Sequence, residues 1–333
     1  MCVSDQGCVQ MKAVCATGID ANDPLSVLSV GECDAPTTPD GWVRVTVRAA
    51  SLNHHDIWTL RGVGVRPEHI GVPLGTDAAG VTDDGKEVIV HAVLGTSADN
   101  DDETLAADLH LLSEAGVSGT HAEYVVVPAR NLIPKPATLS WEQASCLPTA
   151  YLTAYRMLFS RAGLREGDHV LVQGAGGGVA TAAIVLAHAA GIEVSVTSRS
   201  EQKRARALEI GATTAIETGG RLARRADAVI ETVGAATWDH SLKSLRPGGT
   251  IVVSGATSGG DPSAQLARVF WRGLSILGST MGTRDELVAL VDFLVRTGAT
   301  PIIDTVLPLS DAHSAYQRVA DGHTFGKVVL TLS

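Results

Sequence analysis

The sequence predicts an α/β protein in two parts: a β-rich first part, and a second part built on a doubly wound parallel sheet. Three observations predict this fold class. Up to about residue 130, short β-type runs are broken by Gly, Pro and Asp. After Ser140, strand and helix patterns alternate, which implies crossover connections and a parallel sheet covered on both faces. A glycine-rich turn at residues 174–180 (GAGGGVA) joins the first of these strands to an apolar helix, as in Rossmann folds.

Each predicted element follows from its local pattern. In the first part, residues 43–48 (VRVTVR) alternate with the period of two that a half-buried strand requires. Residues 11–16, 88–93 and 122–127 are further predicted strands. In the second part we expect helices at 141–161, 178–190, 201–210 and 285–296, and strands at 169–173, 193–197, 228–231, 250–254 and 327–331. Residues 1–10 precede the first strand and are interpreted as an N-terminal extension.

Composition and charge exclude several classes of protein. With 333 residues, of which 45% are hydrophobic, the chain can build about two domains with sizeable cores. The 36 acidic residues outnumber 26 basic ones, giving a net charge of −10, so neither nucleic acid nor an anionic membrane is an expected partner. Five cysteines without a C-x-x-C pair argue against a disulfide framework, and no export signal is recognisable. We therefore expect a cytoplasmic protein.

The glycine-rich turn is the sharpest motif. Glycines let a backbone turn tightly and approach a pyrophosphate, while free N–H groups and the helix dipole supply partial positive charge. The predicted cofactor-binding residues here are Ala175, Gly176, Gly177, Gly178 and Val179. The alternative is a purely structural turn, but its place between a strand and a helix favours a dinucleotide.

The end of the next strand predicts which dinucleotide binds. NAD-binding sites usually place an acidic residue there for the ribose hydroxyls, whereas this chain has Ser198 and Arg199, followed by Lys203. A carboxylate would repel the 2′-phosphate of NADP(H), and these three side chains can bond it. The alternative is a solvated basic helix start. The sequence predicts NADP(H) as the cofactor.

Seven landmarks in order give the chain a resemblance to a known family. Besides the glycine-rich turn they are residues 51–58 (SLNHHDIW), 74–80 (LGTDAAG), 119–125 (GTHAEYV), 152–155 (LTAY), 274–280 (LSILGST) and 325–330 (FGKVVL). From residue 11 onwards the chain resembles the medium-chain dehydrogenase/reductase family, and most of all its quinone oxidoreductase and zinc-binding dehydrogenase branch. The resemblance implies a GroES-like catalytic domain (11–133 and 280–333) interrupted by a Rossmann dinucleotide-binding domain (134–279). It also implies a small-molecule substrate and a homodimer.

The chain departs from the zinc-dependent members of this family. Those members place a Cys, a His followed by Glu, and a second Cys around a catalytic zinc. The corresponding positions here hold Asn53, Thr76 followed by Asp77, and Thr149. Tetrahedral zinc prefers thiolate or imidazole ligands, so we expect no catalytic metal.

An enzyme without a Lewis acid is better suited to a conjugated acceptor, either a quinone or an α,β-unsaturated carbonyl, than to alcohol oxidation. The resemblance makes Asn53 the candidate for positioning the nicotinamide ribose or the substrate oxygen. His55 is the candidate general acid, since its ordinary pKa of about 6.5 lies near working pH; the alternative is a structural histidine. Asp56 is expected to fix local structure. Trp58 is a candidate wall of the substrate pocket or else ordinary core.

Four more cofactor contacts follow from the resemblance and from fold rules: His54, Thr153, Gly255 and Lys327. The alternative for His54 is a surface loop histidine, and the alternative for Lys327 is a surface lysine. We expect His54 and its neighbours His55 and Asp56 on a strand or loop. Two other functions stay open. One is an alcohol or aldehyde dehydrogenase with a divergent site, and the other is a non-catalytic NADPH-binding protein.

Overall fold

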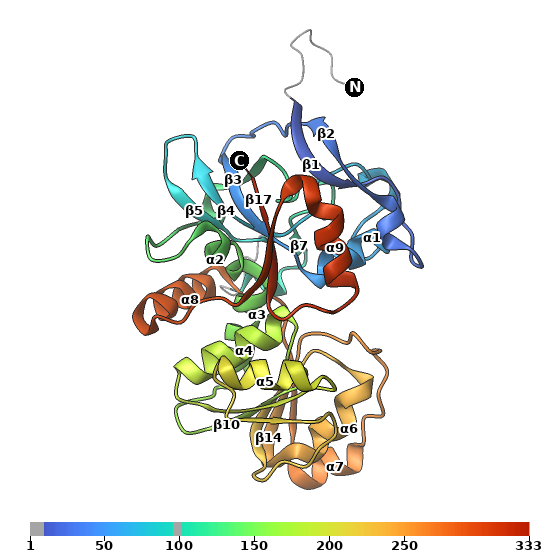
Figure 1. Cartoon of the computed structure of the whole chain (residues 1–333), viewed down its shortest axis with the longest axis vertical. Coiled ribbons are helices and arrows are strands. Elements are labelled where there is room, and N and C mark those ends of the chain that lie inside the picture. The colour runs from blue at the N-terminus through green and yellow to red at the C-terminus, as the bar shows by residue number, and fades with distance from the viewer. Residues whose placement is uncertain (1–9, 96–101, 333) are drawn as a thin grey trace. The chain divides into compact units, whose positions relative to one another are not determined.

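The computed structural model describes residues 10–95 and 102–332. The chain divides into two compact units (Figure 1). The first unit comprises Met1–Pro148, Thr305–Gly322 and Val328–Ser333, and the second comprises Thr149–Asp304 and His323–Lys327. The domain boundaries expected at 133/134 and 279/280 stay a prediction. The expected extension, residues 1–10, lies outside the described residues except for Gln10, which begins β1.

The first unit is dominated by antiparallel strands. A two-stranded ribbon pairs β1 (Gln10–Ala16) with β2 (Leu28–Asp34). The main sheet has the order β16-β17-β3-β4-β5-β9, with β8 also paired to β3. Its strands are β3 (Trp42–Ser51), β4 (Asp77–Thr82), β5 (Glu87–Val90), β8 (Tyr124–Pro128), β9 (Leu132–Pro134), β16 (Ile303–Pro308) and β17 (Lys327–Thr331). Two short strands, β6 (Val93–Leu94) and β7 (His110–Leu111), pair separately, and the α-helices are α1 (His54–Leu60), α2 (Trp141–Ser145) and α9 (Ala312–Ala320).

The predicted strands of this unit are confirmed where the alternation was strongest. In β3, Val45 and Val47 are buried while Arg44 and Arg48 are exposed, which is the half-buried strand that the alternation predicted. The strand expected at 88–93 is divided in the structure: β5 ends at Val90, and Val93 begins the separate short strand β6.

The segment carrying the two adjacent histidines differs from the prediction. We expected residues 54–56 on a strand or loop, but the structure has them in the first turn of α1. The reason is local: the Asp56 carboxylate accepts a hydrogen bond from the backbone N–H of Asn53 at 2.7 Å. An acidic side chain at this third helical position satisfies an N–H group that a helix start otherwise leaves unpaired.

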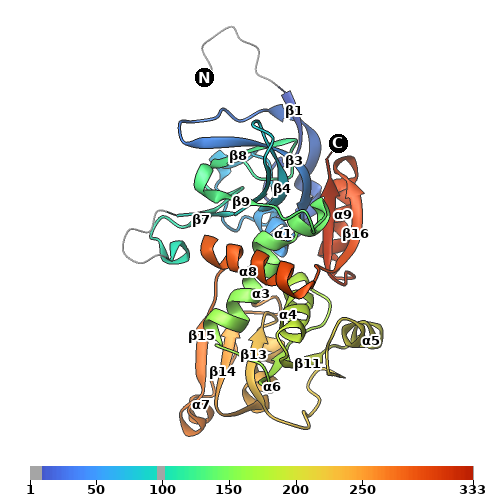
Figure 2. The same cartoon turned by 90° about the vertical axis from the view of Figure 1, so that its left-hand side faces the viewer.

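The second unit contains a six-stranded parallel sheet of order β12-β11-β10-β13-β14-β15 (Figure 2). Its strands are β10 (His169–Val172), β11 (Glu193–Thr197), β12 (Thr214–Ile216), β13 (Ala226–Glu231), β14 (Leu245–Val253) and β15 (Ser275–Gly278). Its α-helices are α3 (Leu152–Tyr155), α4 (Gly178–Ala189), α5 (Glu201–Glu209), α6 (Ala235–Ser244), α7 (Leu266–Arg272) and α8 (Arg284–Thr297), and π-helical turns flank α3. The predicted alternation of strands and helices is confirmed.

The strand order reverses between β10 and β13. From β10 the chain moves outward to β11 and β12, then returns to β13 on the other side and continues to β15. With right-handed crossovers, α4 and α5 cover one face of the sheet and α6 and α7 the other. In open parallel sheets, ligands bind outside the carboxyl ends of the strands at such a reversal.

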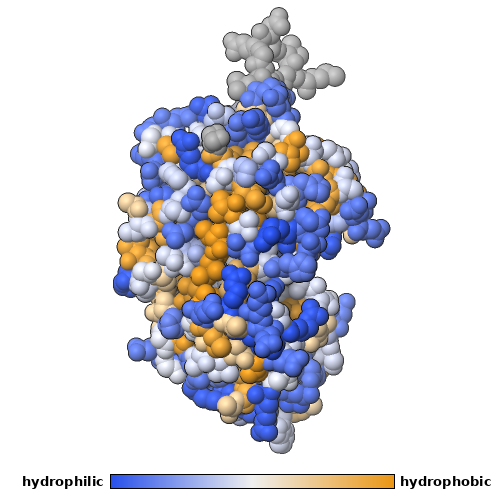
Figure 3. Space-filling model, in the orientation of Figure 1, coloured by the Kyte–Doolittle hydropathy of each residue, from blue (hydrophilic) through white to orange (hydrophobic). Residues whose placement is uncertain are grey.

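No helix among residues 10–95 and 102–332 is both long and apolar enough to cross a membrane. On the face shown in Figure 3, hydrophilic residues cover much of the surface and apolar ones lie between them.

Candidate active site

Asn53 lies between β3 and α1, is 8% exposed, and its side-chain nitrogen donates hydrogen bonds to two neighbours. Its Nδ2 donates to Asp77 Oδ2 at 2.9 Å and to Thr76 Oγ1 at 3.2 Å. The Ser51 hydroxyl donates to the same Asp77 oxygen at 2.8 Å. Asp77 is fully buried at the start of β4, so the sheet fixes the carboxylate and the carboxylate fixes the amide. The three positions expected to replace zinc ligands in this unit therefore form one hydrogen-bonded cluster.

This cluster does not fit a zinc ion. The Asn53 nitrogen carries hydrogens that it donates to Asp77 and Thr76, whereas a zinc ligand must present a lone pair, usually from a thiolate or imidazole. Thr149, the remaining counterpart of a ligand, belongs to the second unit. In the part of the chain that the structure describes, no three His, Cys, Asp or Glu side chains gather so as to hold a metal ion.

His55 is the second residue of α1, and its Nε2 lies 2.9 Å from Oε1 of Glu114. Burial lowers the pKa of His55, but the Glu114 hydrogen bond and the charges of Asp56, Glu114 and Asp77 outweigh it. The net pKa is raised above the ordinary value of 6.5. The imidazole therefore favours its protonated, proton-donating form.

The other candidates on α1 have different surroundings. Asp56 is fully buried and bonds the Asn53 backbone, which agrees with the structural role expected for it. Trp58 is half-buried, and His54 is exposed with its ring stacked on the Trp58 indole at 6.4 Å between centroids. Residues 53–58 all belong to the first unit, whereas the remaining cofactor candidates, Thr153 to Lys327, belong to the second.

The glycine-rich turn follows β10 and leads directly into α4. Gly174 has a φ of +84°, which favours glycine. Gly177 is the residue before the first turn of α4, so the free N–H groups of the helix start lie at the end of this loop. A side chain at Gly176 would meet the Lys203 ammonium 2.8 Å away and the Thr324 carbonyl oxygen 2.9 Å away. Only glycine fits there, and the absence of side chains leaves the backbone N–H groups of the loop uncovered.

Two lysines lie along this loop. Besides Lys203 beside Gly176, the Lys327 Cδ would lie 2.9 Å from a Cβ placed on Gly178. Lys327 is only 2% exposed, so the alternative of a surface lysine is wrong. Burial lowers the pKa of Lys203 and the charge of Arg206 adds to this, while Asp304 opposes it. An anion at the loop would meet the Lys203 ammonium besides the helix start, with the stem of Lys327 alongside.

The three residues predicted to select the dinucleotide, which follow β11, have different surroundings. Arg199 is exposed, two residues past the end of the strand. Ser198 is buried, its hydroxyl accepts from the Ser200 N–H at 3.2 Å, and its carbonyl accepts from Arg204 at 2.7 Å. Lys203 lies against the glycine loop instead. Arg199 is therefore the one of the three that is open to a ligand beyond the strand.

Two further candidates lie at defined places in the second unit. Thr153 is buried within α3. Gly255 is half-buried just past β14, where a Cβ would come within 3.0 Å of the Thr232 carbonyl oxygen at the end of β13. Gly255 therefore lies at the carboxyl edge of the sheet, as expected.

One supporting residue carries no motif in the sequence: Glu231, a fully buried carboxylate at the end of β13. It accepts hydrogen bonds from the backbone N–H groups of Val233 and Gly234 and from the hydroxyls of Thr237 and Ser241, at 2.6–3.0 Å. These bonds join the end of β13 to the start of α6. Glu231 therefore stabilises the carboxyl edge of the sheet, where ligands bind in this fold. No local signal in the sequence separates it from a strand-end surface acid.

A second polar chain continues this support toward the glycine loop. Gln173, just before the loop, donates to Ser241 at 2.9 Å and accepts from the Thr197 hydroxyl at 2.7 Å. The Gly174 N–H in turn donates to Thr197 at 3.2 Å. The ends of β10, β11 and β13 are thus tied together beneath the loop, which holds its backbone in place for a ligand.

Comparison with known proteins agrees with both units. Residues 39–137 match the family described as alcohol dehydrogenase GroES-like domain, and residues 178–296 match zinc-binding dehydrogenase. A solved NAD-dependent alcohol dehydrogenase is 35% identical and superposes with a TM-score of 0.87, covering 97% of this chain and all of that one.

Several curated relatives span nearly the whole chain. The zinc-type alcohol dehydrogenase-like protein C1773.06c of Schizosaccharomyces pombe is 30% identical, over 88% of this chain and 91% of its own length. Acryloyl-coenzyme A reductase of Metallosphaera sedula is 30% identical, over 91% and 96%. Mouse quinone oxidoreductase is 26% identical, over 89% and 91%. The chain also matches the NorB polyketide synthase protein of Streptomyces orinoci at 31% identity, but spans only 14% of its length.

These matches agree with the landmark motifs, the antiparallel first unit and the doubly wound parallel sheet of the second. The GroES-like and Rossmann folds predicted from the sequence are confirmed. The chain is an oxidoreductase that belongs to the medium-chain dehydrogenase/reductase family.

Proposed function

We propose that this protein uses NADPH to reduce a quinone or an α,β-unsaturated carbonyl compound without a catalytic metal. The observation that carries the proposal is the hydrogen-bonded amide of Asn53. Its nitrogen donates to Asp77 and Thr76, and the family resemblance makes Asn53 and Thr76 the counterparts of zinc ligands. Acryloyl-coenzyme A reductase and quinone oxidoreductase among the relatives support this substrate class.

The residues of the second unit fit a dinucleotide phosphate. The open backbone of Gly176, Gly177 and Gly178 and the start of α4 offer N–H groups. Lys203 and Lys327 add positive charge along the same loop, and Arg199 is free to bond a 2′-phosphate. When bound, the cofactor supplies a hydride.

A conjugated acceptor needs little activation, because the negative charge that follows hydride addition is delocalised onto an oxygen. Hydrogen-bond donors and a proton source then suffice. We assign the orientation of the substrate oxygen or the nicotinamide ribose to Asn53, and the proton to His55, whose pKa is raised by its hydrogen bond to Glu114 and by the surrounding carboxylates.

The test is NADPH oxidation by the purified protein with a panel of quinones and enones, beside alcohols with NADP⁺ and aldehydes with NADPH. We expect turnover with conjugated acceptors and little with simple alcohols or aldehydes. Preferred turnover of an alcohol or aldehyde would support the dehydrogenase alternative. NADPH binding without turnover of any acceptor would support the non-catalytic one.

We predict that the purified protein carries no stoichiometric zinc, because an amide and two hydroxyls stand where thiolate and imidazole ligands are needed. Elemental analysis of protein purified without chelator checks this, and activity should survive treatment with a chelator. About one tightly held zinc per chain, with activity lost on its removal, would contradict the prediction.

A second copy of this chain is the proposed protein partner. Among the described residues β15 pairs only with β14 and is an edge of the parallel sheet. The helix before it, α7, exposes Leu266, Phe270 and Trp271 at 71%, 72% and 84%. An unpaired strand edge beside exposed apolar side chains is typical of a surface that another chain covers. The cytoplasmic location, expected because no export signal is recognisable and the cysteines suggest no disulfide framework, remains a prediction.

Replacing Trp271 with Asp should therefore shift the protein from dimer to monomer, measured by light scattering after size exclusion. Val295→Asp, at a 50% exposed apolar residue of α8, is the matched control and should leave the dimer intact. A dimer that survives Trp271→Asp at low micromolar concentration would place the interface elsewhere.

A further inference from the structure

The ion pair between His55 and Glu114 joins residues 59 positions apart in the first unit. The side chains are 16% and 17% exposed, so the pair is largely shielded from water yet not sealed. Glu114 lies in the turn after β7, a segment to which the sequence analysis assigned no functional residue. Its carboxylate is the direct partner of the candidate proton donor.

The Glu114 carboxylate is held from several sides. Its Oε2 accepts from the Leu111 N–H at 2.8 Å, while Oε1 faces His55. The neighbours Ser113 and Ala115 have φ values of +67° and +51°, a left-handed conformation that costs a non-glycine residue about 1–2 kcal/mol. A side chain at Gly64 would collide with Glu114 Oε1. The strained turn therefore fixes the backbone of Glu114, and the missing side chain at Gly64 leaves room for its carboxylate in this one position.

This arrangement determines which ring nitrogen exchanges a proton. A carboxylate only accepts hydrogen bonds, so Nε2 of His55 must carry a hydrogen toward Glu114. Nδ1 is then the nitrogen that gains or loses a proton. It has no hydrogen-bond partner among the described residues, so no protein group competes for its proton. Because the atom is buried, the side chains that cover it must move before substrate or water reaches it.

The charges around the pair act in one direction. Asp56, Asp77 and Glu114 face the imidazole and favour its charged form. Burial raises the pKa of Glu114, but hydrogen bonds from His55 and the Leu111 N–H, with the charges of His55 and His110, hold it below its ordinary value. Glu114 therefore stays ionised while His55 titrates, and its negative charge is present throughout.

We propose that Glu114 is a positioning residue that fixes His55 with Nδ1 as its proton-exchanging atom. The catalytic meaning of this arrangement rests on the proposed function. After hydride addition, the electron-rich substrate takes the Nδ1 proton: the N–H bond breaks, and an O–H or C–H bond forms on the substrate. The neutral imidazole keeps its Nε2 hydrogen on Glu114, and water returns a proton to Nδ1.

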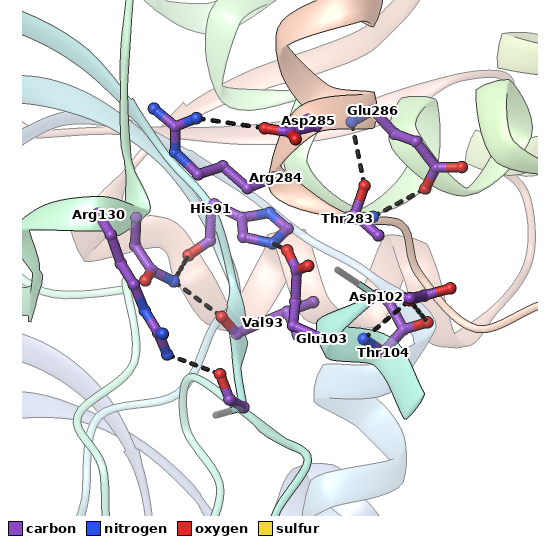
Figure 4. A network of polar contacts seen from close by, with 12 residues as sticks. His91, Val93, Asp102, Glu103, Thr104, Arg130, Thr283, Arg284, Asp285 and Glu286 are labelled. Atoms are coloured by element: carbon purple, nitrogen blue, oxygen red, sulfur yellow. Dashed lines mark hydrogen bonds and ion pairs between the residues drawn. The ribbon is translucent and has the colours of Figure 1, made fainter. Parts of the chain in front are cut away.

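The first experiment is an NMR pH titration of the full chain with ring-¹⁵N-labelled histidine, in which His55→Gln assigns the His55 signals. In the wild-type protein we expect the Nε2–H form of the neutral ring and a midpoint above 6.5. In Glu114→Gln, which keeps the size but removes the charge, the midpoint should move to lower pH. The control is Glu103→Gln, since Glu103 bonds His91 in the same way at 3.2 Å (Figure 4), and it should leave the His55 titration unchanged.

The second measurement is the pH profile of kcat with the best conjugated acceptor. A proton donor works in its protonated form, so kcat should fall as the pH rises through the midpoint of His55, by about tenfold per pH unit. Glu114→Gln should begin that fall at lower pH. Its loss relative to wild type should be small at low pH, where both proteins are protonated, and should grow as the pH rises above the variant's midpoint. A merely structural loss would lower kcat equally at every pH.

An Nδ1–H tautomer in the wild-type protein would overturn the proposal without any variant. So would an unchanged His55 midpoint in folded Glu114→Gln. If no acceptor oxidises NADPH, the proposed function fails, and the titration still decides whether Glu114 sets the state of His55.

Discussion

Replacing Asn53 with Ala should lower kcat with a conjugated acceptor by on the order of 100-fold, the scale expected when one reacting partner is misaligned. The change removes the amide that Asp77 and Thr76 hold in a fixed direction. It should also cost about 1–3 kcal/mol of unfolding free energy, because the buried Asp77 carboxylate loses a hydrogen bond. Steady-state kinetics and thermal unfolding measure the two effects separately.

The chain offers a matched control for this variant. Ser51 donates to the same Asp77 oxygen at 2.8 Å from within β3, so Ser51→Ala should destabilise the protein by a similar amount. A loss of this size lowers Tm by roughly 2–4 °C per kcal/mol. If only Asn53→Ala loses turnover, Asn53 acts in the reaction. If both variants lose turnover in proportion to their stability, or Asn53→Ala keeps full turnover, the assignment is wrong.

The sequence predicted the elements whose information is local. The strict alternation of β3 and the apolar runs of β10 and β11 need only their own residues to show which face is buried. The glycine-rich turn was equally readable, because its glycines stand together between a strand pattern and a helix pattern. Resemblance to a family then joined the segments into two domains.

Helix α1 was missed because its signals conflict. Two adjacent histidines and a β-branched isoleucine are weak helix formers, and seven residues show too little of the helical period. The deciding interaction is the Asp56 carboxylate on the Asn53 N–H. This helix-start signal was present in the sequence as an Asn followed three residues later by Asp.

The polar partners in the candidate site could not be predicted for a different reason. The bond between His55 and Glu114 spans 59 residues, and that between Asn53 and Asp77 spans 24. Such pairs depend on strand register and turn geometry that no local pattern records. Lys327 illustrates the same limit: its sequence fits an exposed strand end, yet its side chain lies buried beside the glycine loop.

Replacing Arg199 with Ala should weaken NADPH binding by about 1.5–3 kcal/mol, the range for a hydrogen bond to a charged group, or about 10- to 150-fold in Kd. NADH binding should be nearly unchanged, because NADH lacks the 2′-phosphate. The structure supports a single dominant contact, because Arg199 is exposed beyond β11 while Ser198 is buried. Fluorescence titration with both cofactors measures the effect.

Lys203→Ala provides the contrast that identifies which phosphate each side chain meets. Because Lys203 lies against Gly176 in the phosphate loop, and both cofactors share the pyrophosphate, its loss should weaken NADPH and NADH binding alike. The wild-type protein should prefer NADPH, although the solved relative at 35% identity is described as NAD-dependent. Equal affinity of the wild-type protein for the two cofactors, or an equal loss of both in Arg199→Ala, would mean that Arg199 is a solvated residue at a helix start. A loss confined to NADPH in Arg199→Ala and shared by both cofactors in Lys203→Ala would place the 2′-phosphate beyond β11 and the pyrophosphate at the glycine loop.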